Sequence, residues 1–204
     1  MIEKTLIEVL AFPTFVLGFN LTGRYDPDET IKGSSKIVAS HGLLNSDNSE
    51  DGSSYGKIGF LDSKPSLKTL MQECVDTYTS KLDQEDLGLW DSWINIGSKG
   101  SQIIRHRHEG SVISGAFYPK IDGDPELSPP LILHSPLSPY HSNTKYTQVN
   151  AINSYEQILP SWEGMLWLFP SWCEHSTTAS QVDKRYVISF NTYPKKYDAL
   201  ANRD

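Results

Sequence analysis

Cysteine is scarce in this sequence. Only Cys74 and Cys173 occur among 204 residues, and neither belongs to a C-x-x-C pair. A disulfide framework is therefore not indicated. We expect both thiols to be reduced.

Long apolar runs are also missing. No run reaches 18 apolar residues, so no membrane-spanning helix is predicted. The N-terminal stretch has an early acidic residue, Pro13 near its centre and no small-residue cleavage site, which is not typical of a secretory signal. We expect a cytoplasmic protein with no membrane partner.

Basic residues are outnumbered by acidic ones. The chain has 18 Lys and Arg against 25 Asp and Glu, which gives a formal net charge of −7. A protein that binds a polyphosphate chain normally presents an excess of positive charge to it. We therefore expect no nucleic-acid partner.

The residues that are present suffice for a core. Hydrophobic residues make up 38% of the chain, and aromatic residues make up 11% of it. A chain of this length has the size of one domain, so we expect residues 1–204 to form a single domain.

The N-terminal half has one clear helical pattern. Apolar residues recur at three- and four-residue steps behind Pro65-Ser66, which predicts a helix over 66–82. Residues 6–19 suit an edge strand, or one broken at Pro13. Residues 40–57 are rich in Ser, Asn, Asp and Gly and carry little to bury, which predicts a mobile loop. Its part 45–54 is either a solvated loop or a lid over the mouth of a site.

From Leu89 onward the pattern changes to short β-branched and aromatic runs separated by Gly, Pro and Ser turns. Many short strands without helices between them indicate a sandwich, a barrel or a jelly roll. Residues 119–150 hold six of the twelve prolines, which predicts a long irregular insertion. We expect a mainly β core over about 89–193, with the N-terminal strand and the helix packed on it.

Two histidines stand in one strand-like run. In His106-Arg107-His108 the period of two places both imidazoles on one face and Arg107 on the other, so the two rings can hold one metal ion. The alternative is a partly exposed strand with two polar residues facing solvent. The remaining histidines, His41, His134 and His141, have no partner spacing and are expected to be solvated or satisfied side chains.

A third histidine follows the strand that ends at Pro170. His175 lies ten residues before Arg185, and Arg185, Val187, Ser189 and Asn191 share one face of the last strand. An inward arginine needs an anion, and a guanidinium grips a carboxylate with two parallel hydrogen bonds. Three protein ligands on one side of an iron would leave positions open for a keto acid and oxygen.

These segments, taken in order, resemble the iron(II)- and 2-oxoglutarate-dependent oxygenases, and within them a group without an assigned substrate. The resemblance rests on W-x-N, H-x-H, S-G-x-x-Y, G-x-L-x-x-F-P-S-W-x-x-H and R-x-x-x-S-F-N, which are read at Trp93–Asn95, His106–His108, Ser114–Tyr118, Gly164–His175 and Arg185–Asn191. It covers about residues 6–193. The last strand is also similar to that of prolyl hydroxylases.

The resemblance implies a double-stranded β-helix, a cupin-like jelly roll. It implies iron(II) bound by His106, His108 and His175, with 2-oxoglutarate and O2 as cosubstrates. It also implies an enzyme that hydroxylates a small molecule or a protein side chain and yields succinate and CO2. The cosubstrate would contact Arg185, Ser189, Tyr118 and Asn95, and the candidate substrate-pocket residues are Trp172, Asn191 and Ser114.

One position departs from the family pattern. Most of the superfamily has H-x-Asp or H-x-Glu, whereas His108 makes the ligand set three neutral imidazoles. Glu109 and Glu174 are the neighbouring carboxylates, but Glu109 should face away on an unbulged strand and Glu174 precedes His175 on a turn.

Two other functions remain open at this point. One is a three-histidine cupin-type dioxygenase that needs no keto acid, and the other is a jelly-roll module that binds metal without turnover. The Arg185–Ser189 strand favours the 2-oxoglutarate-dependent oxygenase over the cupin-type enzyme, because an enzyme without a keto acid does not need a carboxylate anchor. The sequence is also compatible with a homodimer.

Overall fold

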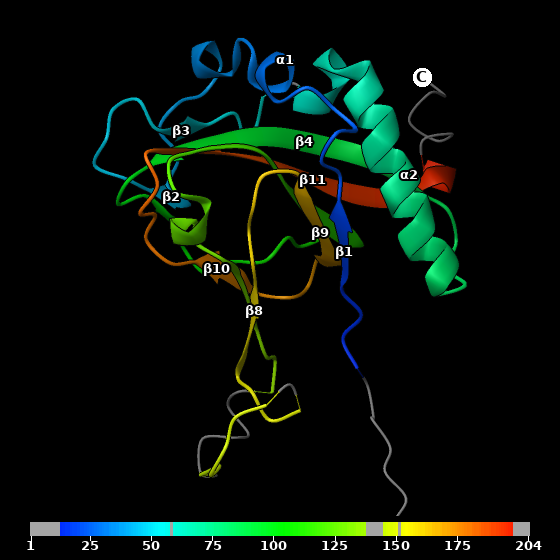
Figure 1. Cartoon of the computed structure of the whole chain (residues 1–204). Helices are drawn as coiled ribbons and strands as arrows, with labels where there is room; N and C mark the ends of the chain where they lie inside the picture. Colours follow the sequence, from blue (N-terminus) through cyan, green and yellow to red (C-terminus); the bar gives the residue numbers. More distant parts are fainter. Residues whose placement is uncertain (1–12, 58, 138–144, 151, 198–204) are drawn as a thin grey trace, which may run out of the picture.

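The computed structural model describes residues 13–57, 59–137, 145–150 and 152–197. Two facing β-sheets dominate it, and α2 flanks the larger one (Figure 1). The expected mainly β architecture with one flanking helix is therefore confirmed. That residues 1–204 form one domain stays a prediction, because both ends of the chain lie outside the described residues.

The large sheet has the strand order β1-β9-β6-β11-β4-β3, and every pairing in it is antiparallel. Its strands are β1 (Leu17–Asn20), β9 (Met165–Pro170), β6 (Ile113–Asp122), β11 (Lys184–Pro194), β4 (Leu87–Ser98) and β3 (Gly52–Ser53). The long central strand β11 pairs with β4 on one side and with β6 on the other, so it is buried within the sheet.

A smaller sheet faces the inner side of the large one. Its order is β10-β7-β8, formed by β10 (His175–Thr177), β7 (Leu131–His134) and β8 (Glu156–Leu159). A separate two-stranded pair joins β2 (Leu44–Asn45) to β5 (Gln102–Ile103). Short 3-10 turns complete the chain: η1 (Ser34–Lys36), η2 (Phe60–Ser63), η3 (Pro125–Leu127) and η4 (Lys195–Tyr197).

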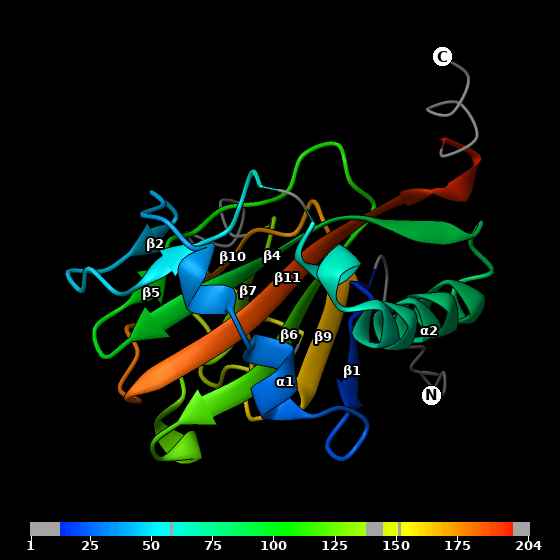
Figure 2. The ribbon, with the colours of Figure 1, turned by 90° about the horizontal axis from the view of Figure 1, so that it is seen from above.

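Two helices cover the outer side of the large sheet (Figure 2). The short α1 (Pro27–Ile31) lies against β6, and the long α2 (Pro65–Lys81) lies against β4. Proline at the first helical position suits α2, because its missing N–H has no partner there in any helix. The predicted helix over 66–82 is therefore confirmed within one residue at each end.

Alternation along the strands creates two cores. Ile94, Ile188 and Phe190 point to the outer side and pack in one cluster with the buried face of α2. Ala116, Tyr118 and Val187 point to the inner side and pack with residues of the smaller sheet. The inner core is the more polar of the two, because the candidate site lies in it.

Several expected segments differ from the structure. Residues 51–54 are buried, and Gly52–Ser53 among them form β3 against β4, so the prediction of a loop with little to bury is wrong for them. The reason is Asp51, whose carboxylate accepts hydrogen bonds from the backbone N–H (3.0 Å) and hydroxyl (3.0 Å) of Ser98. The anchor argues against a lid role for residues 51–54, whereas for the largely exposed residues 45–50 the lid interpretation stays a prediction.

The predicted N-terminal strand (6–19) and the predicted proline-rich insertion (119–150) also differ from the structure. Within 6–19 the described strand is β1, which begins only at Leu17 and forms the edge of the sheet; residues 1–12 lie outside the described residues. The segment 119–150 is less irregular than expected, because β6 extends to Asp122 and β7 occupies 131–134. Residues 138–144 lie outside the described part.

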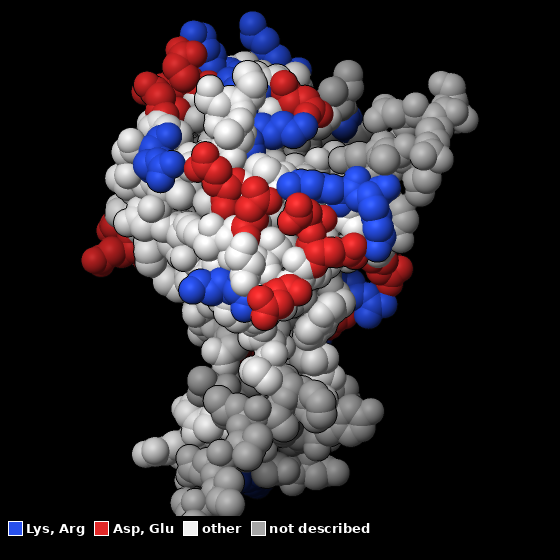
Figure 3. Space-filling view, turned by 90° about the vertical axis from the view of Figure 1, so that its right-hand side faces the viewer, with Lys and Arg blue, Asp and Glu red and all other residues white. Residues whose placement is uncertain are grey.

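The molecular surface mixes both signs of charge. On the face shown in Figure 3, lysine and arginine side chains are interspersed with aspartate and glutamate side chains. Among the described residues, no helix combines the length and apolar character needed to cross a membrane.

Candidate active site

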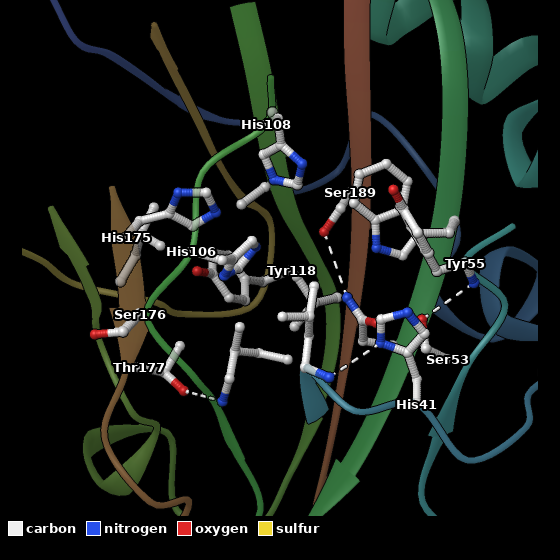
Figure 4. Close-up of a pocket in the computed structure, with 18 of the residues that line it drawn as sticks. His41, Ser53, Tyr55, His106, His108, Tyr118, His175, Ser176, Thr177 and Ser189 are labelled. Atoms are coloured by element: carbon white, nitrogen blue, oxygen red, sulfur yellow. Dashed lines mark hydrogen bonds between the residues drawn. The ribbon is translucent and has the colours of Figure 1, made fainter. Parts of the chain in front are cut away.

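Three histidines meet between the two sheets (Figure 4). The ring nitrogens of His106, His108 and His175 that could bind a metal all lie within 4.8 Å of one another. Their ring centroids are 4.2 Å (His106 to His175), 5.0 Å (His106 to His108) and 5.1 Å (His108 to His175) apart. The structure therefore brings together the three residues that the sequence proposed as ligands.

Backbone hydrogen bonds set this arrangement. His106 and His175 form an isolated antiparallel bridge, in which the N–H of His106 donates to the carbonyl of His175 (3.0 Å) and the N–H of His175 donates back (2.8 Å). The N–H of His108 donates to the carbonyl of Ser171 (3.0 Å). The expected strand through His108 is wrong in extent, since β5 ends at Ile103 and His106 takes part only in this isolated bridge.

Two backbone carbonyls orient the rings. Nδ1 of His106 lies 2.8 Å from the carbonyl oxygen of Ile104, and Nδ1 of His175 lies 3.0 Å from that of Cys173. An Nδ1–H that donates to such a carbonyl leaves the Nε2 lone pair free, which is the usual way that proteins present a histidine to a metal.

Burial keeps the three imidazoles neutral. It lowers the pKa of His106, and together with the neighbouring imidazoles it lowers the pKa of His108 to about 4 and that of His175 to about 3. All three are therefore in the metal-binding form at neutral pH. A neutral histidine set with no proton to displace fits a divalent transition metal.

Neither neighbouring carboxylate joins the histidines. Glu174 pairs with Arg105, whose Nε lies 2.8 Å from its oxygen, and Glu109 pairs with Arg107 at 2.6 Å. Both pairs lie at the surface. Within the part of the chain that the structure describes, the histidine cluster thus has no carboxylate member.

A cavity lies beside the histidines, with about 620 Å³ of empty space including its opening to solvent. We call it the inner cavity. Its walls come from strands β4, β6, β7, β9 and β11 and from the N-terminal segment. They include Trp93, Asn95, Tyr118, Leu131, Phe169, Arg185, Val187, Ser189, His41, Ser53 and Tyr55.

Arg185 is the charged group of the inner cavity. Its side chain is 4% exposed, one guanidinium nitrogen donates to the carbonyl of Pro129 (2.8 Å), and the guanidinium lies 5.8 Å from the centre of the Tyr118 ring. Burial lowers its pKa, yet a guanidinium stays charged at neutral pH. No carboxylate pairs with it among the described residues, so the cavity holds an uncompensated positive charge.

The other predicted cosubstrate residues lie close to Arg185. Burial raises the pKa of Tyr118, so its phenol keeps the proton that it would donate. The amide nitrogen of Asn95 lies 3.5 Å from the hydroxyl of Ser189. All four predicted cosubstrate residues line the inner cavity.

The three predicted substrate-pocket residues are more scattered. Trp172 is 51% exposed, and Ser114 and Asn191 are joined by a hydrogen bond of 2.8 Å. Among the described residues that line the inner cavity, none of these three occurs. Asn191 instead lines a second groove, which also borders His106 and His108.

Several lining residues were missed by sequence reasoning. His41 is a satisfied side chain as expected, since its Nδ1 accepts a hydrogen bond from the N–H of Leu43 (3.2 Å), but it also lines the inner cavity. It packs edge-on against Tyr55, with ring centroids 5.0 Å apart. Tyr55 in turn contacts Trp93 at 5.0 Å. The parity of Trp93 with Asn95 on β4 was a usable signal, whereas nothing local distinguishes His41 or Tyr55. His134 is a satisfied side chain, hydrogen-bonded to Ser176, and His141 lies outside the described residues.

Comparisons with known proteins agree with this arrangement. Residues 91–191 match the family model described as "Putative 2OG-Fe(II) oxygenase". No curated protein matches the chain.

Solved structures of similar fold include several oxygenases. A prolyl hydroxylase from Trichoplax adhaerens in complex with a peptide of hypoxia inducible factor has a TM-score of 0.56 and 14% identity, over 92% of this chain and 87% of that one. HygX from Streptomyces hygroscopicus, with nickel and 2-oxoglutarate bound, has a TM-score of 0.53 and 13% identity, over 89% of this chain and 83% of that one. A prolyl-4-hydroxylase from Pseudomonas putida has a TM-score of 0.51 and 12% identity, over 88% of this chain and 92% of that one. At such identities the likeness concerns the fold, and it confirms the predicted double-stranded β-helix.

Proposed function

We propose that this chain is an oxygenase of the 2OG-Fe(II) family, whose model matches residues 91–191, and that with iron(II) and 2-oxoglutarate it hydroxylates a small molecule or a protein side chain. Succinate and CO2 are the co-products of this reaction. The observation that carries the proposal is the buried, unpaired Arg185 in the same cavity as three neutral histidines.

His106, His108 and His175 hold the iron in this proposal. When bound, iron and the keto acid supply the activation of O2 that no amino-acid side chain provides. Three neutral ligands leave both positive charges of the ion uncompensated. The dianion 2-oxoglutarate matches that charge, which favours its binding beside the histidines.

Arg185 binds the distal carboxylate of 2-oxoglutarate. The phenol of Tyr118 donates a hydrogen bond to the same carboxylate, and Ser189 and Asn95 line the path between it and the histidines. In the low-dielectric surroundings of the cavity, the guanidinium replaces the water that the carboxylate gives up. Leu131, Phe169 and Val187 exclude further water from this end.

The test is an anaerobic titration of the iron(II) protein with 2-oxoglutarate, followed by the weak visible charge-transfer band of a chelated keto acid. We expect the band in the wild-type protein. Arg185→Ala should retain iron and lose roughly 2–4 kcal/mol of 2-oxoglutarate binding, as for truncation of one partner of a buried charge pair. His175→Ala should lose iron itself. Equal loss of iron in both variants would contradict the assigned roles.

The all-histidine ligand set favours one second candidate, a dioxygenase that binds its organic substrate directly and needs no keto acid. This candidate predicts that iron binds while 2-oxoglutarate produces no band and no heat in isothermal titration calorimetry. Retained iron without either signal would transfer the proposal to this second activity.

A further inference from the structure

A second cavity opens on the other side of the histidines. Its described lining includes His106, His108 and Tyr55, which it shares with the inner cavity, together with Trp90, Asp91 and Tyr193. We call it the outer groove. It has about 790 Å³ of empty space, opening to solvent included, so it is large enough for a substrate side chain that approaches the histidines from outside.

A β-bulge directs two neighbouring side chains into the outer groove. On β4, Asp91 pairs with Asn191 and Leu89 pairs with Thr192, so Trp90 is an extra residue with no partner on β11. Such a bulge re-aims side chains that strict alternation would send to opposite faces. Trp90 and Asp91 consequently both line the groove.

Asp91 gives the outer groove an uncompensated negative charge. Its carboxyl is hydrogen-bonded to the backbone of Ser92, and burial raises its pKa. It forms no ion pair among the described residues, whereas the other acid of the groove, Glu109, is neutralised by Arg107 at 2.6 Å. The outer groove thus holds an unpaired negative charge, as the inner cavity holds the unpaired positive charge of Arg185.

Two aromatic rings stand beside this carboxylate. Trp90 and Tyr193 pack edge-on with their centroids 5.4 Å apart, and Trp90 is 54% exposed. The faces of such rings attract organic cations, most strongly when a carboxylate is near to supply the opposite charge. Exposed tryptophan is otherwise costly in water, so a ligand that covers it gains apolar contact as well.

We propose that the outer groove binds a cationic group of the substrate, an alkylammonium or a guanidinium, with Asp91 as its counter-ion and Trp90 and Tyr193 as its aromatic walls. This assignment rests on the proposed function, because it names the substrate class of the same site. Arg185 and Asp91 sort the two ligands by charge: Arg185 attracts the dianion and repels the cation, and Asp91 does the reverse. The two ends lie about 20 Å apart, since Arg185 and the Asp91 partner Asn191 are six residues apart on β11.

The test is calorimetric titration of the anaerobic iron(II) and 2-oxoglutarate protein with three probes. They are N-acetyl-lysine methylamide, its neutral counterpart N-acetyl-norleucine methylamide, and n-pentylamine, which has the amine without peptide groups. We expect the lysine probe to bind about tenfold or more tightly than the norleucine probe, a difference of about 1.4 kcal/mol. Comparable binding of pentylamine would place the recognition in a free amine, and tighter binding of the lysine probe would place it in a peptide.

Variants locate the binding. Asp91→Asn should weaken binding of the lysine probe about tenfold, and Trp90→Leu, at a position that is 54% exposed, should also weaken it. Glu73→Gln removes the same charge from the exposed face of α2, on the far side of the large sheet, and should leave binding unchanged. Equal affinity of the two amino-acid probes, or unchanged binding in Asp91→Asn, would overturn the assignment.

The affinity for 2-oxoglutarate, measured in the same samples, separates this inference from the proposed function. Wild-type protein that binds 2-oxoglutarate but discriminates against no neutral probe would overturn the inference and leave the function standing. Protein that binds the lysine probe through Asp91 but takes no 2-oxoglutarate would support the groove and overturn the function.

Discussion

At the scale of single residues, the site depends on neutral histidines held by backbone carbonyls. Ile104 and Cys173 fix the tautomers of His106 and His175, so the ring nitrogens that face each other carry lone pairs. Burial makes it unfavourable to protonate any of the three imidazoles. A bound metal ion removes that conflict.

The first prediction concerns the pH dependence of the metal-free protein. The folded pKa of His108 (about 4) lies below its ordinary value of 6.5, so the unfolded chain binds more protons as the pH falls. The free energy of unfolding should therefore decline below about pH 6.5, by about 2 kcal/mol for His108 between about pH 7 and pH 5. Urea unfolding in the presence of a chelator measures it.

The matched variant for this measurement is His108→Gln. Glutamine does not titrate, so the variant should lose less stability than the wild-type protein over the same pH interval. Identical losses would show that His108 does not carry the effect and that other groups, such as the carboxylates, account for the slope.

At the scale of elements, β11 organises the site. It pairs with β4 and β6 at once, and its inner face carries Arg185, Val187 and Ser189 into the inner cavity. Its partner β4 carries Asn95 and Trp93 to the inner cavity and, through the bulge at Trp90, Asp91 to the outer groove. The irregular point in the sheet thus coincides with the second cavity.

The second prediction concerns how β3 is attached to β4. Asp51 is 8% exposed and accepts hydrogen bonds from the backbone and hydroxyl of Ser98. Asp51→Ala leaves these donors without a partner, which should lower the free energy of unfolding by about 1–3 kcal/mol. Urea unfolding of this variant is compared with that of Asp47→Ala, an exposed acid of the same segment.

The expected contrast is a lower urea midpoint for Asp51→Ala and a nearly unchanged one for Asp47→Ala. Equal midpoints would mean that β3 is held by its strand pairing with Asn95 and Ile96 alone. Because Ser53 of β3 lines the inner cavity, loss of the Asp51 anchor should also weaken 2-oxoglutarate in the anaerobic titration.

At the scale of the whole molecule, the site joins distant parts of the chain. The segment of His106 and His108 meets that of His175 through the bridge between these residues and through the hydrogen bond of His108 to Ser171. The wall of His41 and Tyr55 comes from the N-terminal third of the chain. A metal ion bound to all three ligands would therefore add a cross-link between segments that are remote in sequence.

The third prediction is that iron(II) raises the thermal stability of the protein. A ligand present at 100 times its Kd adds about 2.7 kcal/mol when it binds the folded state alone. For a domain of this size, the gain corresponds to an increase in Tm of about 5–10 °C. Anaerobic calorimetry with and without iron(II) measures it.

His175→Ala provides the control, since it removes the ligand on the far side of the bridge. Its Tm should respond weakly to iron(II). An equal rise in the variant and the wild-type protein would show that the ion binds elsewhere.

The sequence by itself determined the features that repeat with a local period. The helix over 66–82 follows from apolar residues on one face and a proline start. The common orientation of Arg185, Val187 and Ser189 follows from the alternation of a strand. The ordered motifs also sufficed to indicate the family and its fold.

Only the tertiary structure decided which remote residues share a space. His41 and Tyr55 reach the cavity because their segment is tied to β4 through Asp51 and β3, and no local pattern records such a tie. The bulge at Trp90 depends on a register between β4 and β11 that two strands settle jointly. Local periodicity sets the face on which a side chain lies, whereas pairing between distant strands sets what that face meets.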